Sequence, residues 1–359
     1  MLDPNSPLPK YYQLKEYLKD AIRRGKISPG AQLPSENTLV QQFAVSRHTV
    51  RQAIGELENE GLVYREQGRG TFCAFPEKAK AGKIAVVTTY ISDYIFPAMI
   101  GGIEEVTSGA GYSLILANTN NDKVKEAQCL EVLLNDDIVG FLIEPTKSVK
   151  ENVNSHYYRE LEKRGIPYLM LNAVYPELDP AYVIMDDEAG GYVITNYVLQ
   201  LGHRLVAGIF KADDRQGVNR QAGFERALAG AGLTPSGDLV GNYETEERDF
   251  YPYQFARRVL QQAARPSCIV CYNDQIALQV LQGIRDEGLR VPEDISLVGY
   301  DDSSLAVASE VKLTTIRHPK AEMGRQAARL LLGMLAERMD KPRFVYPPEL
   351  VVRSSCRQV

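Results

Sequence analysis

Two arginines near the N-terminus, Arg47 and Arg51, have the type and spacing to read DNA bases. Being four residues apart, they lie on one face of a helix, opposite the apolar residues Val50, Ile54 and Leu57. A guanidinium group on such a face can donate two hydrogen bonds to O6 and N7 of guanine in the major groove. Exposed arginines are also common as solvated charge, so the prediction of DNA contact depends on the surrounding elements.

A second set of polar residues follows apolar, strand-like runs further along the chain. Its members are Glu144, Asn172, Asp186, Asn273, Asp274, Asp301 and Asp302. Ligands bind at the carboxyl ends of strands in parallel sheets, and carboxylates, amides and an arginine can bind vicinal hydroxyl groups bidentately. Two carboxylates would repel a phosphate dianion, so this mixture favours a neutral monosaccharide over a sugar phosphate.

Three helices and a hairpin are predicted to hold the two arginines. Apolar spacing predicts a helix over residues 11–24, and Ser35 and Ser46 are typical N-caps of two further helices. The last of these helices carries both arginines and ends at Gly61. Two short helices joined by a tight turn indicate a helix-turn-helix, and the alternating segment around the tip at 67–70 indicates a β-hairpin, or wing.

Three further residues are predicted to face DNA because of their positions in these elements. His48 and Thr49 lie at the start of the recognition helix, where such helices contact bases, and Arg69 lies at the glycine-flanked wing tip. Residues 1–74 hold ten Lys and Arg against eight Asp and Glu, whereas the remainder holds 31 against 38. A slightly basic head on an acidic body is typical of proteins in which only the head contacts phosphate.

The head resembles the GntR family of bacterial winged-helix regulators. The resemblance covers residues 10–73 through K-Y-x-Q-L-K, G-x-x-L-P-S-E-x-x-L, F-x-V-S-R-x-T-V-R-x-A-I-x-x-L and G-L-V-Y-x-x-x-G-x-G-T-F. It implies that Lys10 reaches a phosphate and that further residues face operator DNA. These are Ser35, Asn37, Arg47, Thr49 and Arg51, with Gln67 and Arg69 in the wing.

Residues 75–82 are predicted to be a linker, because they carry Pro, Gly and charge without apolar periodicity. Beyond them, strand-like apolar runs alternate with predicted helices over 122–134, 188–201, 217–230, 249–263 and 274–287. This alternation predicts an α/β body, residues 83–359, in which helices cover parallel sheets. The spacing suggests two lobes, roughly 83–180 and 182–310.

The body resembles the LacI-type effector domain, which is built like the periplasmic sugar-binding proteins. The resemblance spans about residues 83 to 355 and includes G-H-R, R-x-A-G-F, Y-N-D-x-x-A, V-P-E-D-I-S-L-V-G-Y-D-D and L-T-T-I-R. It implies a homodimer and a sugar effector. The implied effector-binding residues are Tyr94, Phe96, Glu144, Asn172, Arg220, Phe250, Asn273, Asp301 and His318.

A GntR-type head on a LacI-type body is similar to the arabinose-responsive repressors of Gram-positive bacteria. That resemblance implies L-arabinose as the effector. Each candidate residue also has a structural alternative. Asn273 could only cap a helix, Arg220 could be a buried ion-pair partner, and His318 could be a hydrogen-bonded structural histidine. The aromatic residues Tyr94, Phe96 and Phe250 could only pack in the core or in loops.

Several classes of protein are excluded by motif. The five cysteines are scattered, which indicates reduced thiols, and Cys268 and Cys271 would point to opposite faces of a strand rather than share a metal. The motifs G-x-x-x-x-G-K-[ST], G-x-S-x-G and H-E-x-x-H are absent, which does not exclude catalysis, and neither a metal nor a cofactor is expected. No apolar run approaches a membrane span and no signal peptide is visible, so we expect a cytoplasmic protein.

The sequence therefore predicts a repressor that binds operator DNA as a homodimer and is released by a neutral monosaccharide, with L-arabinose favoured. A regulator of another sugar or of a sugar phosphate is the nearest alternative. An enzyme with a DNA-binding head is a rival class, because GntR heads also occur on aminotransferase-like bodies and Glu144 with Asp301 could act as an acid–base pair. A stand-alone sugar carrier is a third class, which the winged helix disfavours.

Overall fold

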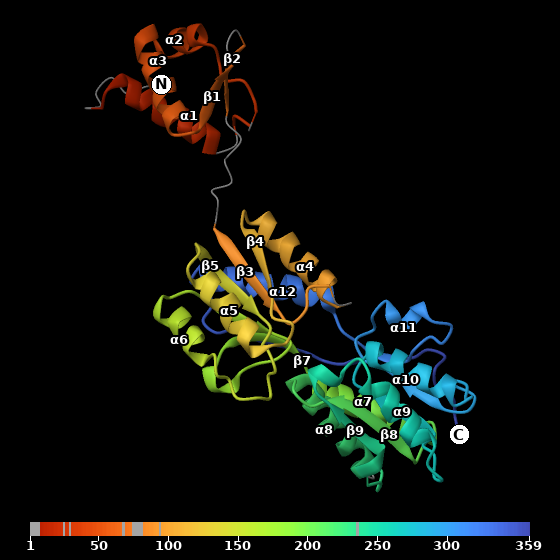
Figure 1. Ribbon diagram of the computed structural model, residues 1–359. Helices are drawn as coiled ribbons and strands as arrows, with labels where there is room; N and C mark the ends of the chain where they lie inside the picture. Colours follow the sequence, from red (N-terminus) through yellow and green to blue (C-terminus); the bar gives the residue numbers. More distant parts are fainter. Residues whose placement is uncertain are drawn as a thin grey trace. The chain divides into compact units, whose positions relative to one another are not determined.

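The structure is a computed structural model, and it describes residues 8–23, 26–28, 30–66, 69–73, 82–92, 95–234 and 237–359. The chain divides into two units, Met1–Ala81 and Gly82–Val359, which are called here the head and the body (Figure 1). Apart from Gly82, the predicted linker over 75–82 lies outside the described residues.

The head is a winged helix-turn-helix, as predicted. Its elements are α1 (Lys10–Arg23), α2 (Glu36–Phe43), α3 (Arg47–Asn59), β1 (Val63–Glu66) and β2 (Gly70–Cys73). Ser35 caps α2 by accepting a hydrogen bond from the Thr38 N–H at 3.1 Å. Ser46 caps α3 in the same way, from the Thr49 N–H at 3.1 Å. Both predicted caps are therefore confirmed, and they fix the start of each helix.

The first lobe of the body is a six-stranded parallel sheet. Its strands, in spatial order, are β13 (Arg343–Tyr346), β7 (Ala181–Met185), β6 (Tyr168–Leu171), β5 (Ile138–Ile143), β3 (Lys83–Thr88) and β4 (Ser113–Asn118). Because side chains alternate along a strand, Ile84 and Val86 face one layer of helices and Ala85 and Val87 face the other. The two layers are α4 (Phe96–Gly109) with α12 (Lys320–Leu335), and α5 (Lys123–Leu134) with α6 (Ser155–Lys163).

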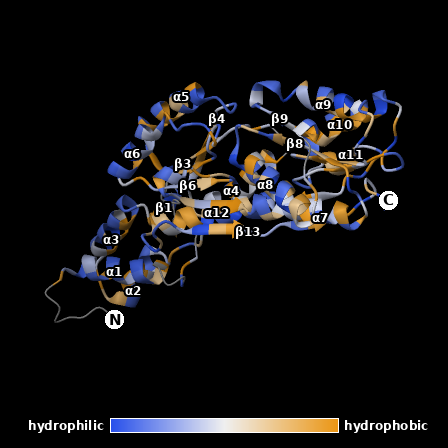
Figure 2. Cartoon of the chain, turned by 90° about the horizontal axis from the view of Figure 1, so that it is seen from below, coloured by the Kyte–Doolittle hydropathy of each residue, from blue (hydrophilic) through white to orange (hydrophobic). Residues whose placement is uncertain are grey.

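The second lobe is a four-stranded parallel sheet. Its strands, in spatial order, are β11 (Ser296–Val298), β10 (Cys268–Cys271), β8 (Val206–Lys211) and β9 (Val240–Tyr243). The covering helices are α7 (Asp187–Gln200) and α8 (Arg215–Gly230) on one face, with α9 (Tyr251–Leu260) and α10 (Asp274–Asp286) on the other. Figure 2 shows hydrophobic residues along strands such as β8 and in a band along α12.

The predicted boundary between the lobes was wrong. Strand β7 was expected to open the second lobe, but it pairs with β6 and β13 in the sheet of the first lobe. The C-terminal segment also returns to the first lobe as α12 and β13. The chain therefore passes between the lobes three times: after β7, after β12 (Thr315–Arg317) and before β14 (Glu349–Val351). Strands β12 and β14 pair antiparallel to each other.

Short elements complete the described fold. They are α11 (Leu305–Ala308) and the 3₁₀ turns η1 (Pro176–Leu178), η2 (Gly237–Leu239) and η3 (Thr245–Glu247). Cys268 and Cys271 pack into different clusters on opposite faces of β10, as predicted, and neither forms a disulfide. Within the described residues, no helix is both long and apolar enough to cross a lipid bilayer.

Candidate functional sites

The recognition helix α3 carries its arginines on the exposed side, and each is held by a residue of α2. Arg47 donates a hydrogen bond from Nη2 to Asn37 Oδ1 at 2.8 Å. Arg51 donates from Nε to Glu36 Oε2 at 2.9 Å. His48 is exposed beside them. The two helices thus present these side chains as one polar surface.

The wing lies against the start of α2 within the head. Ser35, Glu36, Arg69 and Gln32 line one surface hollow, and Gln32 donates a hydrogen bond to the Arg69 carbonyl at 2.6 Å. Arg69 itself pairs with Glu66 of β1. Sequence reasoning missed Glu36 and Gln32, which hold predicted residues in place.

The remaining predicted DNA-facing residues have less informative positions. Lys10 is exposed at the first position of α1, and Thr49 is half-buried with its hydroxyl 2.8 Å from that of Ser46. Gln67 lies outside the described residues.

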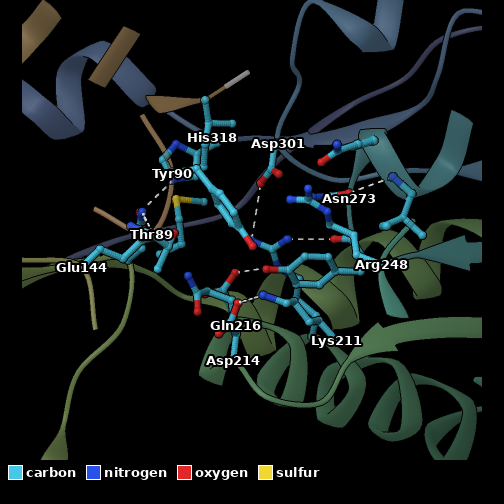
Figure 3. A pocket seen from close by; sticks show the side chains of 18 of the residues that line it. Thr89, Tyr90, Glu144, Lys211, Asp214, Gln216, Arg248, Asn273, Asp301 and His318 are labelled. Carbon is cyan, nitrogen blue, oxygen red and sulfur yellow. Dashed lines mark hydrogen bonds and ion pairs between the residues drawn. The ribbon is translucent and has the colours of Figure 1, made fainter. Parts of the chain in front are cut away.

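The body holds a cavity of about 70 Å³ between its two lobes, called here the interlobe cavity (Figure 3). Seven of the nine residues predicted to bind the effector line it. They are Phe96, Glu144, Asn172, Arg220, Asn273, Asp301 and His318. Glu144 and Asn172 directly follow β5 and β6, and the carboxyl ends of parallel strands meet at one edge of a sheet, which explains why the strand-end residues converge.

Two predicted residues differ from the rest. Phe250 does not line the interlobe cavity: it precedes α9 with 49% of its surface exposed, so its ring faces solvent. The nearby Arg248 lines the cavity instead, with its guanidinium group 4.9 Å from the ring centre of Tyr90. Tyr94 lies outside the described residues, whereas Tyr90, from the same loop, lines the cavity.

Glu144, Asn172 and His318 form a continuous hydrogen-bonded chain. Asn172 donates from Nδ2 to Glu144 Oε1 at 2.8 Å, and its Oδ1 lies 3.2 Å from His318 Nε2. Asn172 has a left-handed backbone, with φ of 60°, which asparagine adopts more readily than most residues. Thr89 donates to Glu144 Oε2 from its backbone N–H at 3.0 Å and from its hydroxyl.

Burial shifts the pKa values along this chain. It raises the pKa of Glu144 to about 7, although the hydrogen bonds from Thr89 and Asn172 favour the carboxylate. It lowers the pKa of His318 to about 4, so the imidazole is neutral at pH 7. This wall of the cavity is therefore weakly charged.

Arg220 organises the opposite wall. It donates to Asp187 Oδ1 at 2.8 Å and to the Tyr272 carbonyl at 2.8 Å, and its Nη2 lies 3.4 Å from Asp301 Oδ1. Its guanidinium group is 3.6 Å from the ring centre of Tyr300. Burial raises the pKa of Asp187 to about 6 despite the arginine. Arg220 is thus a buried ion-pair partner, which was its structural alternative, and it also lines the cavity.

Sequence reasoning missed several charged residues of the interlobe cavity. Lys211 is the last residue of β8 and pairs with Asp214, which also lines the cavity. Burial alone would lower the pKa of Lys211, but Asp214 and Asp213 outweigh it and hold this pKa above its ordinary value. The strand-end pattern could have found Lys211. The same strand-end pattern selected Asp186, but Asp186 caps α7. Its neighbour Asp187 is the residue that lines the cavity.

A second set of contacts joins the lobes beside the interlobe cavity, called here the interlobe latch. It consists of Asn121, Lys147 and Ser148 in the first lobe and Asp214, Arg215, Thr245 and Glu246 in the second. Asn121 donates to Thr245 Oγ1 at 2.7 Å and to Asp214 Oδ1 at 3.2 Å. Lys147 donates to Glu246 at 2.6 Å. Asp214 belongs to both sets, so it connects the latch to the cavity.

The lining of the interlobe cavity suits a small polyhydroxylated ligand. Arginine and lysine side chains donate hydrogen bonds, carboxylates and a neutral imidazole accept them, and Tyr90 and Phe96 add aromatic surface. Both lobes contribute to this lining, so a ligand in the cavity would contact both of them. Elsewhere in the described residues, Asp213, Glu244 and Glu246 approach one another, but Lys147 and Lys150 pair with the two glutamates.

Comparison with known proteins gives consistent results for both units. The family "Bacterial regulatory proteins, gntR family" matches residues 10–73, and the "Periplasmic binding protein-like domain" matches residues 195–356. The arabinose metabolism transcriptional repressor of Geobacillus stearothermophilus is 48% identical, covering 98% of this chain and 99% of that protein. Its counterpart in Halalkalibacterium halodurans is 46% identical, with 96% of each chain covered.

A solved structure with similar architecture contains a sugar. It is a LacI family transcriptional regulator from Enterococcus faecium with bound ribose, which is 26% identical to this chain. The TM-score is 0.66, and the match covers 77% of this chain and 99% of that one. These matches agree with the fold described above.

Proposed function

The chain belongs to the family of arabinose metabolism transcriptional repressors, and we propose that its effector is L-arabinose, bound in the interlobe cavity. It is a sugar-responsive transcriptional repressor that binds operator DNA through its GntR-type head, and it is not an enzyme. The observation that most strongly supports a monosaccharide effector is the donor and acceptor lining of a cavity of about 70 Å³, which suits a monosaccharide better than a larger saccharide. The choice of L-arabinose among monosaccharides follows from the names of the two similar repressors.

DNA recognition is assigned in this proposal to the surface formed by α2, α3 and the wing. Arg47 and Arg51 would exchange their present partners, Asn37 and Glu36, for guanine edges in the major groove. A homodimer would place two recognition helices on the half-sites of a near-palindromic operator. Because operator DNA lies in the cytoplasm of a bacterium, we assign the protein to that compartment.

Induction follows in this proposal from unequal binding of the sugar to two arrangements of the lobes. L-arabinose contacts residues of both lobes and therefore stabilises the closed arrangement. This arrangement must have the lower affinity for operator DNA, because a ligand shifts an equilibrium only by its difference in affinity for the two states. The interlobe latch favours the same closed arrangement.

Calorimetry of the full-length protein with three ligands tests the effector assignment. L-arabinose should bind with measurable heat, D-xylose should bind more weakly, and a pentose 5-phosphate should not bind, because Asp187, Asp214 and Asp301 face the cavity. Binding of the phosphate without binding of L-arabinose would contradict the assignment and favour a regulator of a sugar phosphate.

A further inference from the structure

Two buried polar atoms among the cavity-lining residues lack a hydrogen-bond partner. They are His318 Nδ1 and Gln216 Oε1. An unsatisfied polar atom in a buried site costs free energy until it is paired, so such atoms in a ligand site indicate which groups the ligand must supply. His318 lies where the chain passes from β12 to α12, whereas Gln216 lies in α8 of the second lobe. The two atoms thus belong to different walls of the interlobe cavity.

The protonation of His318 follows from its neighbours, step by step. Thr89 supplies two donors to Glu144 Oε2, and these bonds favour the carboxylate form, which predominates above the Glu144 pKa of about 7. Glu144 Oε1 then accepts from the Asn172 amide, so Asn172 must direct its carbonyl oxygen toward His318. A carbonyl oxygen only accepts hydrogen bonds, and His318 Nε2 must therefore carry the hydrogen.

The ring of His318 cannot turn to exchange its nitrogens without losing this bond. A turned ring would place a carbon where Nε2 now lies 3.2 Å from Asn172 Oδ1. The backbone that carries the ring is held by the His318 N–H, which donates to the Asp301 carbonyl at 3.3 Å, and by Lys320 Nζ, which donates to the His318 carbonyl at 3.3 Å. Only 4% of the surface of His318 is exposed to solvent. Because the buried imidazole is neutral and Nε2 bears its single hydrogen, Nδ1 has a free lone pair.

We propose that His318 presents Nδ1 to the sugar as an uncharged hydrogen-bond acceptor, fixed in the Nε2–H tautomer by Asn172 and Glu144, and so requires a hydroxyl donor at one position of the ligand. The inference relies on the proposed function of the interlobe cavity as the sugar site. Asn172 and Glu144 are positioning residues for the imidazole in this arrangement. Gln216 Oε1 accepts a second hydroxyl from the opposite wall.

The arrangement explains how the cavity distinguishes a hydroxyl donor from groups of similar size. Carboxylates on the opposite wall, such as Asp187 and Asp214, already accept hydrogen bonds from cationic side chains. His318 Nδ1 has no such partner. A sugar with a hydrogen, a fluorine or a methyl ether at this position would leave Nδ1 buried and unpaired, with an expected loss of about tenfold or more in affinity.

Nitrogen NMR of the full-length protein with ¹⁵N-labelled histidine tests the tautomer without any ligand. The chain has four histidines, and the spectrum of a His318→Phe variant identifies the signal of His318. At pH 8, above the pKa of about 7 for Glu144, we expect a neutral ring with hydrogen on Nε2, and L-arabinose should shift the Nδ1 resonance as it becomes hydrogen-bonded. A hydrogen on Nδ1, which would require a protonated Glu144 and a reversed Asn172 amide, would overturn the proposal.

Calorimetry with fluorinated sugars tests the acceptor role. L-arabinose analogues with fluorine in place of one hydroxyl, at C2, C3 or C4, keep their size but lose one donor. In the wild-type protein, loss of the hydroxyl that faces His318 should cost about tenfold in affinity, and loss of the one that faces Gln216 should cost a similar factor. His318→Phe should abolish the first of these penalties and keep the second. Phe96→Leu, a substitution at an apolar residue of the same cavity, should weaken all analogues alike and preserve the selectivity.

The two tests separate this inference from the proposed function. If wild-type protein binds no L-arabinose, the proposed function is wrong, and the NMR spectrum still decides the state of His318. If L-arabinose binds but the three fluorinated analogues keep the same relative affinities in His318→Phe, the sugar site stands and the acceptor role of His318 is wrong. If His318→Phe fails to fold, the spectrum of a more conservative variant, His318→Gln, identifies the His318 signal in the wild-type spectrum, so the tautomer is still decided.

Discussion

The DNA-facing surface of the head and the interlobe cavity of the body both use arginines, but in opposite surroundings. Arg51 has 64% of its side chain exposed and pairs with Glu36 on the protein surface, whereas Arg220 is buried between Asp187 and Asp301. An exposed ion pair contributes about 0–1 kcal/mol, so it can be exchanged for a DNA base at little cost. A buried cluster costs about 3–5 kcal/mol to break, so it remains as a fixed part of the site.

This contrast predicts its largest effect at Arg220. Replacing Arg220 with Met leaves Asp187 and Asp301 buried without their cation, and we expect the body to lose about 3–5 kcal/mol of unfolding free energy together with sugar binding. Arg226→Gln is a matched control, because Arg226 lies in the same helix and pairs with Glu188 on the surface. That variant should change the unfolding free energy by less than about 0.5 kcal/mol. If urea unfolding showed the same loss of unfolding free energy for Arg220→Met and Arg226→Gln, the contrast between buried and exposed arginines would be wrong.

The second prediction concerns the pH dependence of stability, to which the buried carboxyl group of Glu144 in the cavity contributes. Burial raises the pKa of Glu144 in the folded protein to about 7 from an ordinary value of 4.5. The folded state therefore binds this proton more tightly than the unfolded chain does, and the contribution of Glu144 to stability falls as pH rises through about 4.5 to 7. By linkage the full change is up to about 3 kcal/mol.

Urea unfolding of wild-type protein and Glu144→Gln at pH 5 and pH 8 measures this contribution. The wild-type protein should lose more stability than the variant between these two pH values, because glutamine does not titrate. A loss of the same size in both proteins would mean that the carboxyl group of Glu144 titrates alike in the folded and unfolded states.

On the head, single arginine substitutions should reduce DNA binding but spare folding. Arg47→Ala or Arg51→Ala should cost about 1–3 kcal/mol of operator affinity, because each loses a bidentate contact with a base. Lys10→Ala should instead weaken specific and non-specific DNA binding alike and reduce the salt slope by about one unit. Melting temperatures should not change in any of the three variants. If both arginine variants bind operator normally, α3 is not the recognition helix.

The smallest predicted effect concerns the interlobe latch. Asn121→Ala removes two hydrogen bonds between the lobes, and Asn121 does not itself line the cavity, although one of its partners, Asp214, does. The variant should lower the affinity for every sugar by the same factor, equivalent to about 1–2 kcal/mol. Asn118→Ala is the control, since Asn118 bonds only within its own loop through its side chain. Calorimetry with L-arabinose and D-xylose measures the ratio of the two affinities. A changed ratio would show that Asn121 acts on selectivity rather than on closure.

The two regions also differ in how far the sequence predicted them. In the head, helix spacing and the caps Ser35 and Ser46 were sufficient, because those features depend on residues within one or two helical turns. In the body, the strand-end rule found Glu144 and Asn172, since parallel strands bring their carboxyl ends together. The head could therefore be predicted from local sequence, and part of the cavity from a general rule of topology.

The sequence predictions failed where strand pairing between distant segments, or the direction of a side chain, determines the structure. Strand β7 belongs to the first sheet because it pairs with β6 and also with β13, which is more than 150 residues away in the sequence. Phe250 precedes α9 and is 49% exposed, and composition does not reveal this exposure. Gln216 lies inside a helix rather than after a strand, so the strand-end rule could not select it.

The most direct test of the account is release of DNA by L-arabinose. Operator duplexes are selected from random-sequence DNA with the full-length protein, and their binding is followed by fluorescence anisotropy as the sugar is added. We expect L-arabinose to release the operator from wild-type protein, and a variant with Asp301→Ala in the cavity to bind the same operator but not to release it. Persistent operator binding by wild-type protein at saturating L-arabinose would contradict the account.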